Sequence, residues 1–283
     1  MELQGRTAVV TGAASGIGKA ISLRCLEKGM RLVAADVEQP ALEEACAEFT
    51  KIGEVEPVVC DVSEEGDVAR LAEVAHERFG DVHLLVNNAG VAGGTGWMWE
   101  LTPGDWQWAF GVNLWGVVLG IRHFLPRMLE RGVEGHVVNV ASLAGLMAPP
   151  FMGPYTATKH AVVAISESLH HELRLRQAPI RVSVLCPAFV RTRIHESERN
   201  RPEHLRDRPP DSEQGFGSAV MGRALVESGS DPGEIADHVI SAVEEGRFWV
   251  LPHREPLTLV EQRVRSMLEG GDPPSPFGGF AGG

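Results

Sequence analysis

Apolar runs alternate with amphipathic segments almost from the first residue of the chain. The runs are short and rich in β-branched residues, and the segments between them carry apolar residues at helical spacing. The predicted strands cover Arg6–Thr11, Arg31–Ala35, Glu56–Cys60, Leu84–Asn87, His136–Val140, Arg181–Leu185 and Phe248–Leu251. The predicted helices cover about Ile17–Lys28, Pro40–Phe49, Glu64–Phe79, Pro103–Arg131, Tyr155–Arg176 and Asp231–Glu245. Strands separated by helices predict an α/β fold of the doubly wound, Rossmann type, with helices on both faces of a parallel sheet.

No Pro- or Gly-rich linker divides this pattern, so we expect one domain over residues 1–271. Residues 195–217 are polar and contain several prolines and glycines, which predicts a long excursion from that domain. The tail at 272–283, DPPSPFGGFAGG, offers little to pack, and we expect it to be flexible.

Composition and charge narrow the class of protein. The 283 residues are 43% apolar and 23% charged, as in soluble globular proteins, and the net charge of −12 repels polyanions. Four widely spaced cysteines without a CxxC pair suit reduced thiols rather than disulfides or a zinc site. No apolar run approaches the roughly 20 residues that span a bilayer. We therefore expect a cytoplasmic protein without a membrane or a nucleic acid as partner.

A glycine-rich turn follows the first predicted strand and opens the first predicted helix. It reads TGAASGIG over residues 11–18. Glycine lets backbone N–H groups approach a pyrophosphate, and the helix N-terminus adds partial positive charge. Such turns can also serve only to pack a helix on a strand, but the strand–turn–helix context favours a dinucleotide site. Its candidate residues are Gly12, Ser15, Gly16, Ile17 and Gly18.

Asp36 ends the second predicted strand, where dinucleotide folds place a carboxylate that binds the adenosine ribose hydroxyls. A carboxylate at this position repels a 2′-phosphate, and the next residue is Val37 rather than an arginine. The sequence therefore favours NAD over NADP. Lys19, one residue beyond the turn, is a cation that could work against this preference.

Tyr155 and Lys159 lie four residues apart in a predicted helix, so they share one face. A phenol is a poor base at neutral pH, but a nearby ammonium favours the phenolate and lowers the phenol pKa. The pair could therefore take a proton from an alcohol or return one to a ketone. A solvated helix pair would show the same spacing. Ser142, after the strand His136–Val140, supplies a hydroxyl that could hold the substrate oxygen.

These motifs occur in the order and at the spacing of the short-chain dehydrogenase/reductase family, which the chain resembles from about residue 5 to 195. The resemblance rests on TGAASGIG, Asp61-Val62, Asn87-Asn88-Ala89-Gly90, Asn113, Ser142, Tyr155-Thr156-Ala157-Thr158-Lys159 and Cys186-Pro187. It implies that Tyr155 is the catalytic acid/base, that Ser142 polarises the reacting oxygen, and that Lys159 lowers the Tyr155 pKa and binds the nicotinamide ribose. Asn113 is implied to hold a water in a proton relay.

The same resemblance implies further cofactor contacts. Asp61 and Val62 would contact adenine, and Asn88, Ala89 and Gly90 would line the cofactor cleft. Pro187, Val190 and Thr192 match the positions beside the nicotinamide carboxamide, although Ala188 stands where the family often has glycine. No metal is expected, because the histidines form no ligand pattern. A homo-oligomer, a dimer or a tetramer, is also implied.

The substrate is expected to be bulky and apolar or aromatic. Trp97 and Trp99 follow the Asn-Ala-Gly turn, and Phe151 lies between Ser142 and Tyr155. Trp106, Trp108 and Trp115 are expected in the core or in subunit contacts. A lid excursion at about 190–225 occupies the family's substrate-lid position and resembles the branch that oxidises bulky aromatic secondary alcohols. The predicted function is NAD-dependent hydride transfer between a secondary alcohol or its ketone and nicotinamide. The alternatives are an NADPH-dependent ketone reductase and a catalytically silent dinucleotide-binding regulator.

Overall fold

The computed structural model describes residues 1–207 and 226–275 of the chain. Its centre is a seven-stranded sheet in the order β3-β2-β1-β4-β5-β6-β7, and every pairing in it is parallel. The strands are β1 (Thr7–Thr11), β2 (Arg31–Asp36), β3 (Val55–Val59), β4 (Leu84–Asn87), β5 (Gly135–Val140), β6 (Ile180–Leu185) and β7 (Trp249–Val250). The predicted fold class, a Rossmann-type doubly wound parallel sheet, is confirmed.

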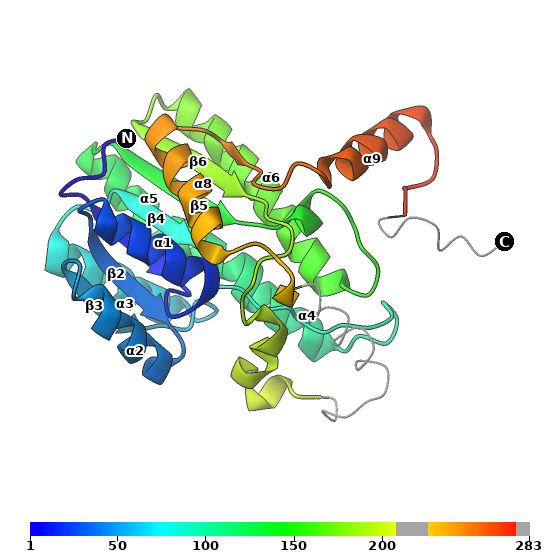
Figure 1. The fold of residues 1–283 in the computed structure, drawn as a ribbon, viewed down its shortest axis with the longest axis horizontal. Helices are drawn as coiled ribbons and strands as arrows, with labels where there is room; N and C mark the ends of the chain where they lie inside the picture. Colours follow the sequence, from blue (N-terminus) through cyan, green and yellow to red (C-terminus); the bar gives the residue numbers. More distant parts are fainter. Residues whose placement is uncertain (208–225, 276–283) are drawn as a thin grey trace.

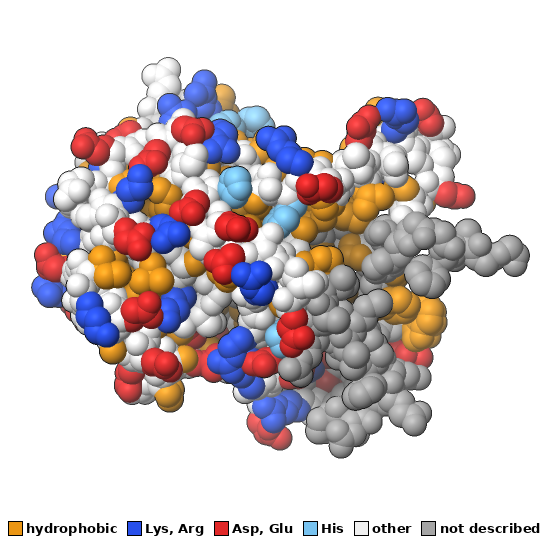
Figure 2. Space-filling view, viewed as in Figure 1, with side chains coloured by type: hydrophobic (Ala, Val, Ile, Leu, Met, Phe, Trp, Pro, Cys, Tyr) orange, Lys and Arg blue, Asp and Glu red, His pale blue; other side chains and the backbone are white. Residues whose placement is uncertain are grey.

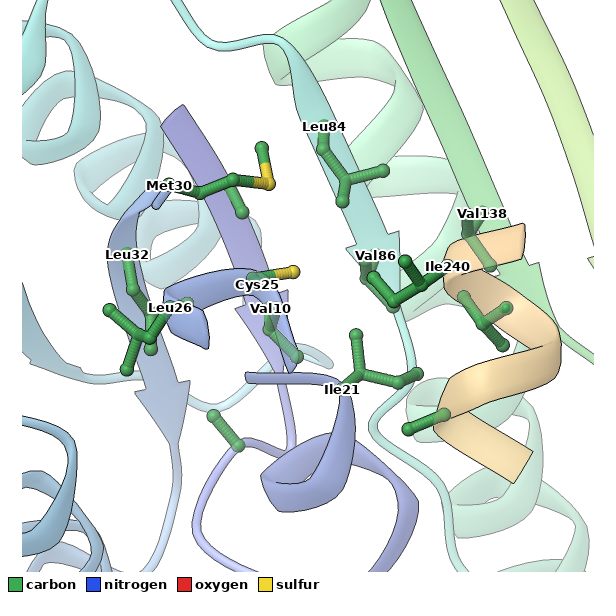
Figure 3. Close-up of a cluster of buried hydrophobic side chains, with 14 of the residues drawn as sticks. Val10, Ile21, Cys25, Leu26, Met30, Leu32, Leu84, Val86, Val138 and Ile240 are labelled. Carbon is green, nitrogen blue, oxygen red and sulfur yellow. The ribbon is translucent and has the colours of Figure 1, made fainter. Parts of the chain in front are cut away.

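Helices cover both faces of the sheet (Figure 1). They are α1 (Gly16–Glu27), α2 (Gln39–Phe49), α3 (Glu65–Phe79), α4 (Pro103–Ala109), α5 (Gly116–Arg131), α6 (Gly153–Leu175), α8 (Pro232–Glu245) and α9 (Leu257–Glu269). On one face, Ile21 of α1 and Ile240 of α8 pack over Val10 and Val86 (Figure 3). Val9, the neighbour of Val10, points to the opposite face and packs in the cluster beneath α3 and α5. This alternation is the period of two that a strand buried on both faces requires.

The predicted elements need correction in two segments of the chain. The helix predicted over Pro103–Arg131 is interrupted by a π-helical turn at Phe110–Trp115, where the Gly116 N–H donates to the Gly111 carbonyl five residues back. No helix or strand is predicted over residues 252–271, yet Leu257–Glu269 form α9. This helix extends away from the layered body (Figure 1), and none of its residues is buried. Its apolar residues Leu257, Val260, Val264 and Met267 do recur at helical spacing, so the sequence contains a signal for this helix. Residues 208–225 of the expected lid excursion and 276–283 of the tail lie outside the described residues.

The stretch Pro103–Arg131 is long and apolar enough to cross a membrane by length and composition, and half of its most apolar window is buried inside the fold. Packing against the sheet accounts for this apolar character. Acidic and basic side chains are interspersed over the face that carries α1 and α8 (Figure 2). All four cysteines are free and buried.

A buried histidine in β5 makes the stability of the fold depend on pH. His136 Nε2 lies 2.7 Å from the Ser183 hydroxyl, which donates its own proton to the Arg247 carbonyl at 2.5 Å. Ser183 must therefore accept from Nε2–H, and the buried Nδ1 finds no hydrogen-bond partner among the described residues. Burial lowers the pKa of His136 to about 3.

We expect His136 to destabilise the fold as the pH falls below about 6.5, its pKa in the unfolded chain. Between there and pH 3 the unfolded chain binds a proton that the folded chain refuses, so stability decreases with decreasing pH. From pH 7 to 5 this costs about 2 kcal/mol. Urea unfolding at both pH values checks it against His136→Gln, which keeps a donor for Ser183 but cannot titrate. Equal pH dependence in the two proteins would contradict this account.

Candidate active site

The candidate residues gather at the carboxyl ends of the parallel strands. The strand order reverses between β1 and β4, and ligands of doubly wound folds bind in the crevice at such a switch point. The glycine-rich turn follows β1, Asp36 ends β2, and Asn88 follows β4. Ser142 follows β5 and Pro187 follows β6. The carboxyl edge of the sheet therefore brings together residues that are far apart in the chain, up to the 175 positions between Gly12 and Pro187.

The glycine-rich turn can receive a pyrophosphate. A Cβ at Gly18 would lie 2.1 Å from the Gly12 carbonyl oxygen, so only glycine lets α1 begin this close to β1. Gly12 itself has φ of +65°, a conformation that glycine adopts without strain. Ser15 is the N-cap of α1 but makes no side-chain cap hydrogen bond. The first N–H groups of α1 are thus not capped by Ser15, which leaves donors for an anion.

Asp36 faces this turn from the end of β2. Its carboxylate accepts hydrogen bonds from the Ala14 N–H at 3.0 Å and the Glu38 N–H at 3.1 Å. Burial raises the pKa of Asp36, and these two N–H groups oppose the rise. Lys19, the cation that could attract a 2′-phosphate, pairs with Glu48 at 2.6 Å. The Asp36 carboxylate is therefore held against the glycine-rich turn, while Lys19 is paired with Glu48.

The segment after β4 is bound directly to β1. The Asn88 and Ala89 N–H groups donate to the Thr11 hydroxyl at 3.0 and 3.1 Å, and the Asn88 amide donates to the Thr11 carbonyl at 2.8 Å. This brings Asn88, Ala89 and Gly90 alongside the glycine-rich turn. Asp61 lies after β3, where its carboxylate accepts from the N–H and hydroxyl of Ser63. The adenine contact expected of Asp61 and of the buried Val62 stays a prediction.

Ser142, Tyr155 and Lys159 are brought together by the loop from β5 to α6. Ser142 caps the 3₁₀ turn Leu143–Gly145 by accepting the Ala144 N–H at 3.1 Å. A Cβ at Gly145 would lie 2.6 Å from the Lys159 carbonyl oxygen, so this glycine lets the turn press directly on α6. The Lys159 ammonium lies 5.6 Å from the centre of the Tyr155 ring and donates to the Val140 carbonyl at 2.9 Å.

The protonation of this group suits a proton donor that can also become a base. Burial raises the pKa of the Tyr155 phenol above its ordinary value, and a hydrogen bond with Ser142 works in the opposite direction. Burial also lowers the pKa of Lys159 to about 8. Tyr155 is therefore protonated at neutral pH, ready to donate to a ketone. Alcohol oxidation needs the phenolate and is favoured as the pH rises.

Asn113 is fully buried in the π-helical turn and connects it to both sides of the site. Its side chain accepts the Val91 N–H at 2.8 Å and donates to the Val91 carbonyl at 3.0 Å. It also donates to the Thr158 hydroxyl at 3.2 Å, which in turn donates to the Tyr155 carbonyl at 2.7 Å. Thr158 is a supporting residue that the sequence analysis did not single out. The water-holding role of Asn113 stays a prediction.

The loop after β6 reaches both the catalytic turn and the glycine-rich turn. The Pro187 carbonyl accepts the Leu143 N–H at 2.8 Å, next to Ser142. Val190 is buried, and Thr192 packs so closely on Gly16 that a Cβ there would lie 3.0 Å from the Thr192 methyl. This arrangement suits the carboxamide contacts expected of these residues, which stay a prediction.

An aromatic cluster lies on the loop after β4. Trp97 and Trp99 stack with ring centroids 5.1 Å apart, and Phe151 stands edge-on to Trp97 at 4.8 Å. The Gly96 N–H donates to the Phe151 carbonyl at 3.0 Å, which joins this loop to the Ser142–Tyr155 segment. Trp99 is 76% exposed and Trp97 is 47% exposed. Such rings can contribute a large apolar surface to a ligand.

Residues 193–207 belong to the expected lid excursion at about 190–225 and form the lid segment, which is anchored on α4 by a buried ion pair. Arg201 donates to the Asp105 carboxylate at 2.7 Å, and both side chains are at most 6% exposed. Arg201 also donates to the Leu205 carbonyl at 3.0 Å and lies over the ring of the buried Trp108. This pair could not be predicted from the sequence, because polar spacing alone does not indicate which of the many charges in the excursion is buried.

The described residues bring together no group of three or more His, Cys, Asp or Glu side chains that could hold a metal ion. The expectation of a reaction without a metal stays a prediction.

Comparison with known proteins agrees with this geometry. The family profile for short chain dehydrogenases matches residues 6–203. A short chain dehydrogenase/reductase from Burkholderia phymatum, crystallised in complex with NAD, is 42% identical and superposes with a TM-score of 0.95 over 97% of this chain and 98% of that chain. The 1-deoxy-11-beta-hydroxypentalenate dehydrogenase of Streptomyces exfoliatus is 43% identical over 194 residues, 68% of this chain and 70% of the relative. The 3beta-hydroxysteroid dehydrogenase 2 of Eggerthella lenta is 34% identical over 235 residues, 83% and 86% of the two chains. The chain therefore belongs to the short-chain dehydrogenase/reductase family and is an oxidoreductase.

Proposed function

We propose that this oxidoreductase uses NAD to oxidise a bulky apolar or aromatic secondary alcohol, or NADH to reduce the corresponding ketone. The proposal rests on one observation: Ser142, Tyr155 and Lys159 lie together at the carboxyl edge of the sheet. The glycine-rich turn and Asp36 lie at the same edge. The names of two relatives, a hydroxypentalenate and a hydroxysteroid dehydrogenase, support a bulky substrate. The exposed cluster of Trp97, Trp99 and Phe151 supports an aromatic one.

Each residue of the site has a defined task in this reaction. Bound NAD supplies the acceptor for the hydride that leaves the carbinol carbon. The Ser142 hydroxyl holds the substrate oxygen, and the Tyr155 phenolate takes the proton from the substrate hydroxyl. The Lys159 ammonium favours that phenolate by its charge. In the reverse direction Tyr155 returns the proton to the ketone oxygen.

Cofactor preference follows from the charges around the adenosine end of the cleft. The Asp36 carboxylate stands there, and Lys19 is paired with Glu48. An added 2′-phosphate would meet a fixed negative charge, and the nearby Lys19 is already paired with Glu48. A homo-oligomer in the cytoplasm is part of the same proposal, and Trp115, which is 53% exposed beside α5, is available for a subunit contact.

The first test is a fluorescence titration with NADH and with NADPH. We expect the Kd for NADPH to exceed that for NADH by about tenfold or more, the effect of one unscreened like-charge contact. Asp36→Asn is the matched variant, and it should narrow the ratio by weakening the repulsion. Tighter binding of NADPH would favour an NADPH-dependent ketone reductase. Binding of NADH without turnover of any alcohol would favour a silent dinucleotide-binding regulator, and binding of neither dinucleotide would overturn the cofactor site.

Turnover with two alcohols then tests the substrate class. With NAD, kcat/KM for 1-phenylethanol should exceed that for 2-propanol by at least about tenfold, because burying a phenyl ring contributes roughly 1.5–3 kcal/mol. Equal values for the two alcohols would contradict the apolar or aromatic pocket.

A further inference from the structure

The lid segment 193–207 crosses the carboxyl edge of the sheet and is attached on both sides of it. On the active-site side, the Ser197 hydroxyl accepts the Ala92 N–H at 3.1 Å, two residues beyond Gly90. The buried Arg201–Asp105 pair lies on the same side. On the opposite side, Arg199 and Asn200 reach Glu38, which follows β2. A short 3₁₀ segment, Ile194–Asn200, therefore spans from the β4 side to the β2 side.

The attachment at Glu38 uses three hydrogen bonds. The Arg199 guanidinium donates to one Glu38 carboxylate oxygen at 2.5 Å and to the other at 3.1 Å. The Asn200 amide donates to the same carboxylate at 3.0 Å. Arg199 is oriented by two further bonds, to the Glu196 carbonyl at 2.9 Å and the Arg193 carbonyl at 3.3 Å. This fork-shaped geometry is the arrangement in which arginine binds a carboxylate most strongly.

Glu38 stands beside the residue expected to bind the adenosine ribose. Its N–H donates to the Asp36 carboxylate at 3.1 Å. Thr192, which directly precedes the lid segment, packs on Gly16 of the glycine-rich turn. The lid segment thus begins beside the glycine-rich turn and reaches Glu38 next to Asp36.

We propose that Glu38, Arg199 and Asn200 form a clasp that encloses the adenosine end of the bound dinucleotide, so that the cofactor leaves when the clasp opens. The inference rests on the proposed function only in taking NADH as the ligand. It makes Glu38 and Arg199 positioning residues for cofactor exchange, with no part in hydride or proton transfer.

Exposure determines which attachment opens. The Arg199 and Glu38 side chains are 27% and 24% exposed, so water can take over their hydrogen bonds when they part. The Arg201 and Asp105 side chains are 6% and 3% exposed, and separating them would leave a buried charge without its partner. The lid therefore opens at the β2 side while its anchor on α4 remains closed.

The test is the dissociation rate of NADH, measured by stopped-flow displacement with excess NAD. Glu38→Ala and Arg199→Ala should each release NADH about fivefold faster, the upper range for loss of an exposed ion pair. The double variant should match Glu38→Ala, because that substitution already removes all three hydrogen bonds to the carboxylate, including the one from Asn200. The exchanged pair, Glu38→Arg with Arg199→Glu, should return the rate toward that of the unaltered protein. Arg131→Gln, which breaks the exposed pair with Asp81 on the opposite edge of the sheet, is the matched control and should leave the rate unchanged.

A purely electrostatic effect gives a different pattern, since NADH is an anion. Removing Glu38 would then slow release and removing Arg199 would speed it. Opposite signs for the two variants, additive effects in the double variant, or unchanged rates would each overturn the clasp while leaving the proposed function intact. Failure of the unaltered protein to bind NADH would overturn both.

Discussion

Replacing Tyr155 with phenylalanine should lower kcat for alcohol oxidation by about 10²–10⁴-fold, the contribution of a positioned acid or base. The substitution removes one oxygen atom and keeps the ring over which Lys159 lies at 5.6 Å. In the proposed function the phenol takes the substrate proton, and the chain has no second tyrosine. The Kd for NADH should change by no more than about twofold, because the residues of the glycine-rich turn and Asp36 are untouched.

Ser142→Ala provides the comparison for this variant. The Ser142 hydroxyl bonds with the phenol, and in the proposed function it also holds the substrate oxygen, so its loss should also lower kcat. Because the two residues act as a unit, the double variant should be little worse than Tyr155→Phe alone. Steady-state kinetics at saturating NAD measure all three. Turnover within tenfold of the unaltered protein in Tyr155→Phe would contradict the assignment of Tyr155 as acid/base.

The sheet and the catalytic group could be predicted because their signals are local. Buried parallel strands are short apolar runs, and Tyr155 and Lys159 share a helix face through spacing alone. The structure explains why glycine is required at Gly18 and Gly145, since a Cβ at either position would overlap a backbone oxygen. Pro57 is compatible with its predicted strand, because β3 lies at the edge of the sheet and needs no N–H on its outer side.

The contacts that were missed are long-range or polar. The π-helical turn around Asn113 depends on how the helix fits between Val91 and Thr158, 67 residues apart in the chain (158 − 91 = 67), and helical periodicity does not contain that information. The contact of Arg199 with Glu38 spans 161 positions. Helix α9 carries apolar residues at helical spacing, Leu257, Val260, Val264 and Met267, although none of its residues is buried in the described part of the chain. Charges in the lid segment look alike in sequence, and only the fold distinguishes the buried Arg201 from the exposed Arg206.

Replacing Arg201 with methionine should detach the lid segment 193–207 from α4. The substitution keeps the side-chain length but leaves the Asp105 carboxylate buried without its guanidinium, a loss of about 3–5 kcal/mol when one partner of a buried pair is removed. The rest of the fold does not depend on this pair, so the cost is met by local opening of the lid rather than by unfolding of the sheet. At about 3 kcal/mol the open population rises by roughly 100-fold.

Hydrogen exchange measures this opening at two amides that the lid covers. The Gly104 N–H donates to Asp207 at 3.0 Å and the Ala92 N–H donates to Ser197, so both should exchange about 100-fold faster in Arg201→Met. Arg199→Ala is the matched control, because it cuts the exposed attachment of the same segment and leaves the anchor on α4 in place. In that variant exchange at Gly104 should change by less than about fivefold. Exchange at Gly104 that is equally fast in both variants would show that the buried pair does not anchor the lid. The difference in Gly104 exchange between the two variants therefore distinguishes the two attachments. The anchor on α4 holds the lid segment in place, and the clasp at Glu38 is the attachment that opens.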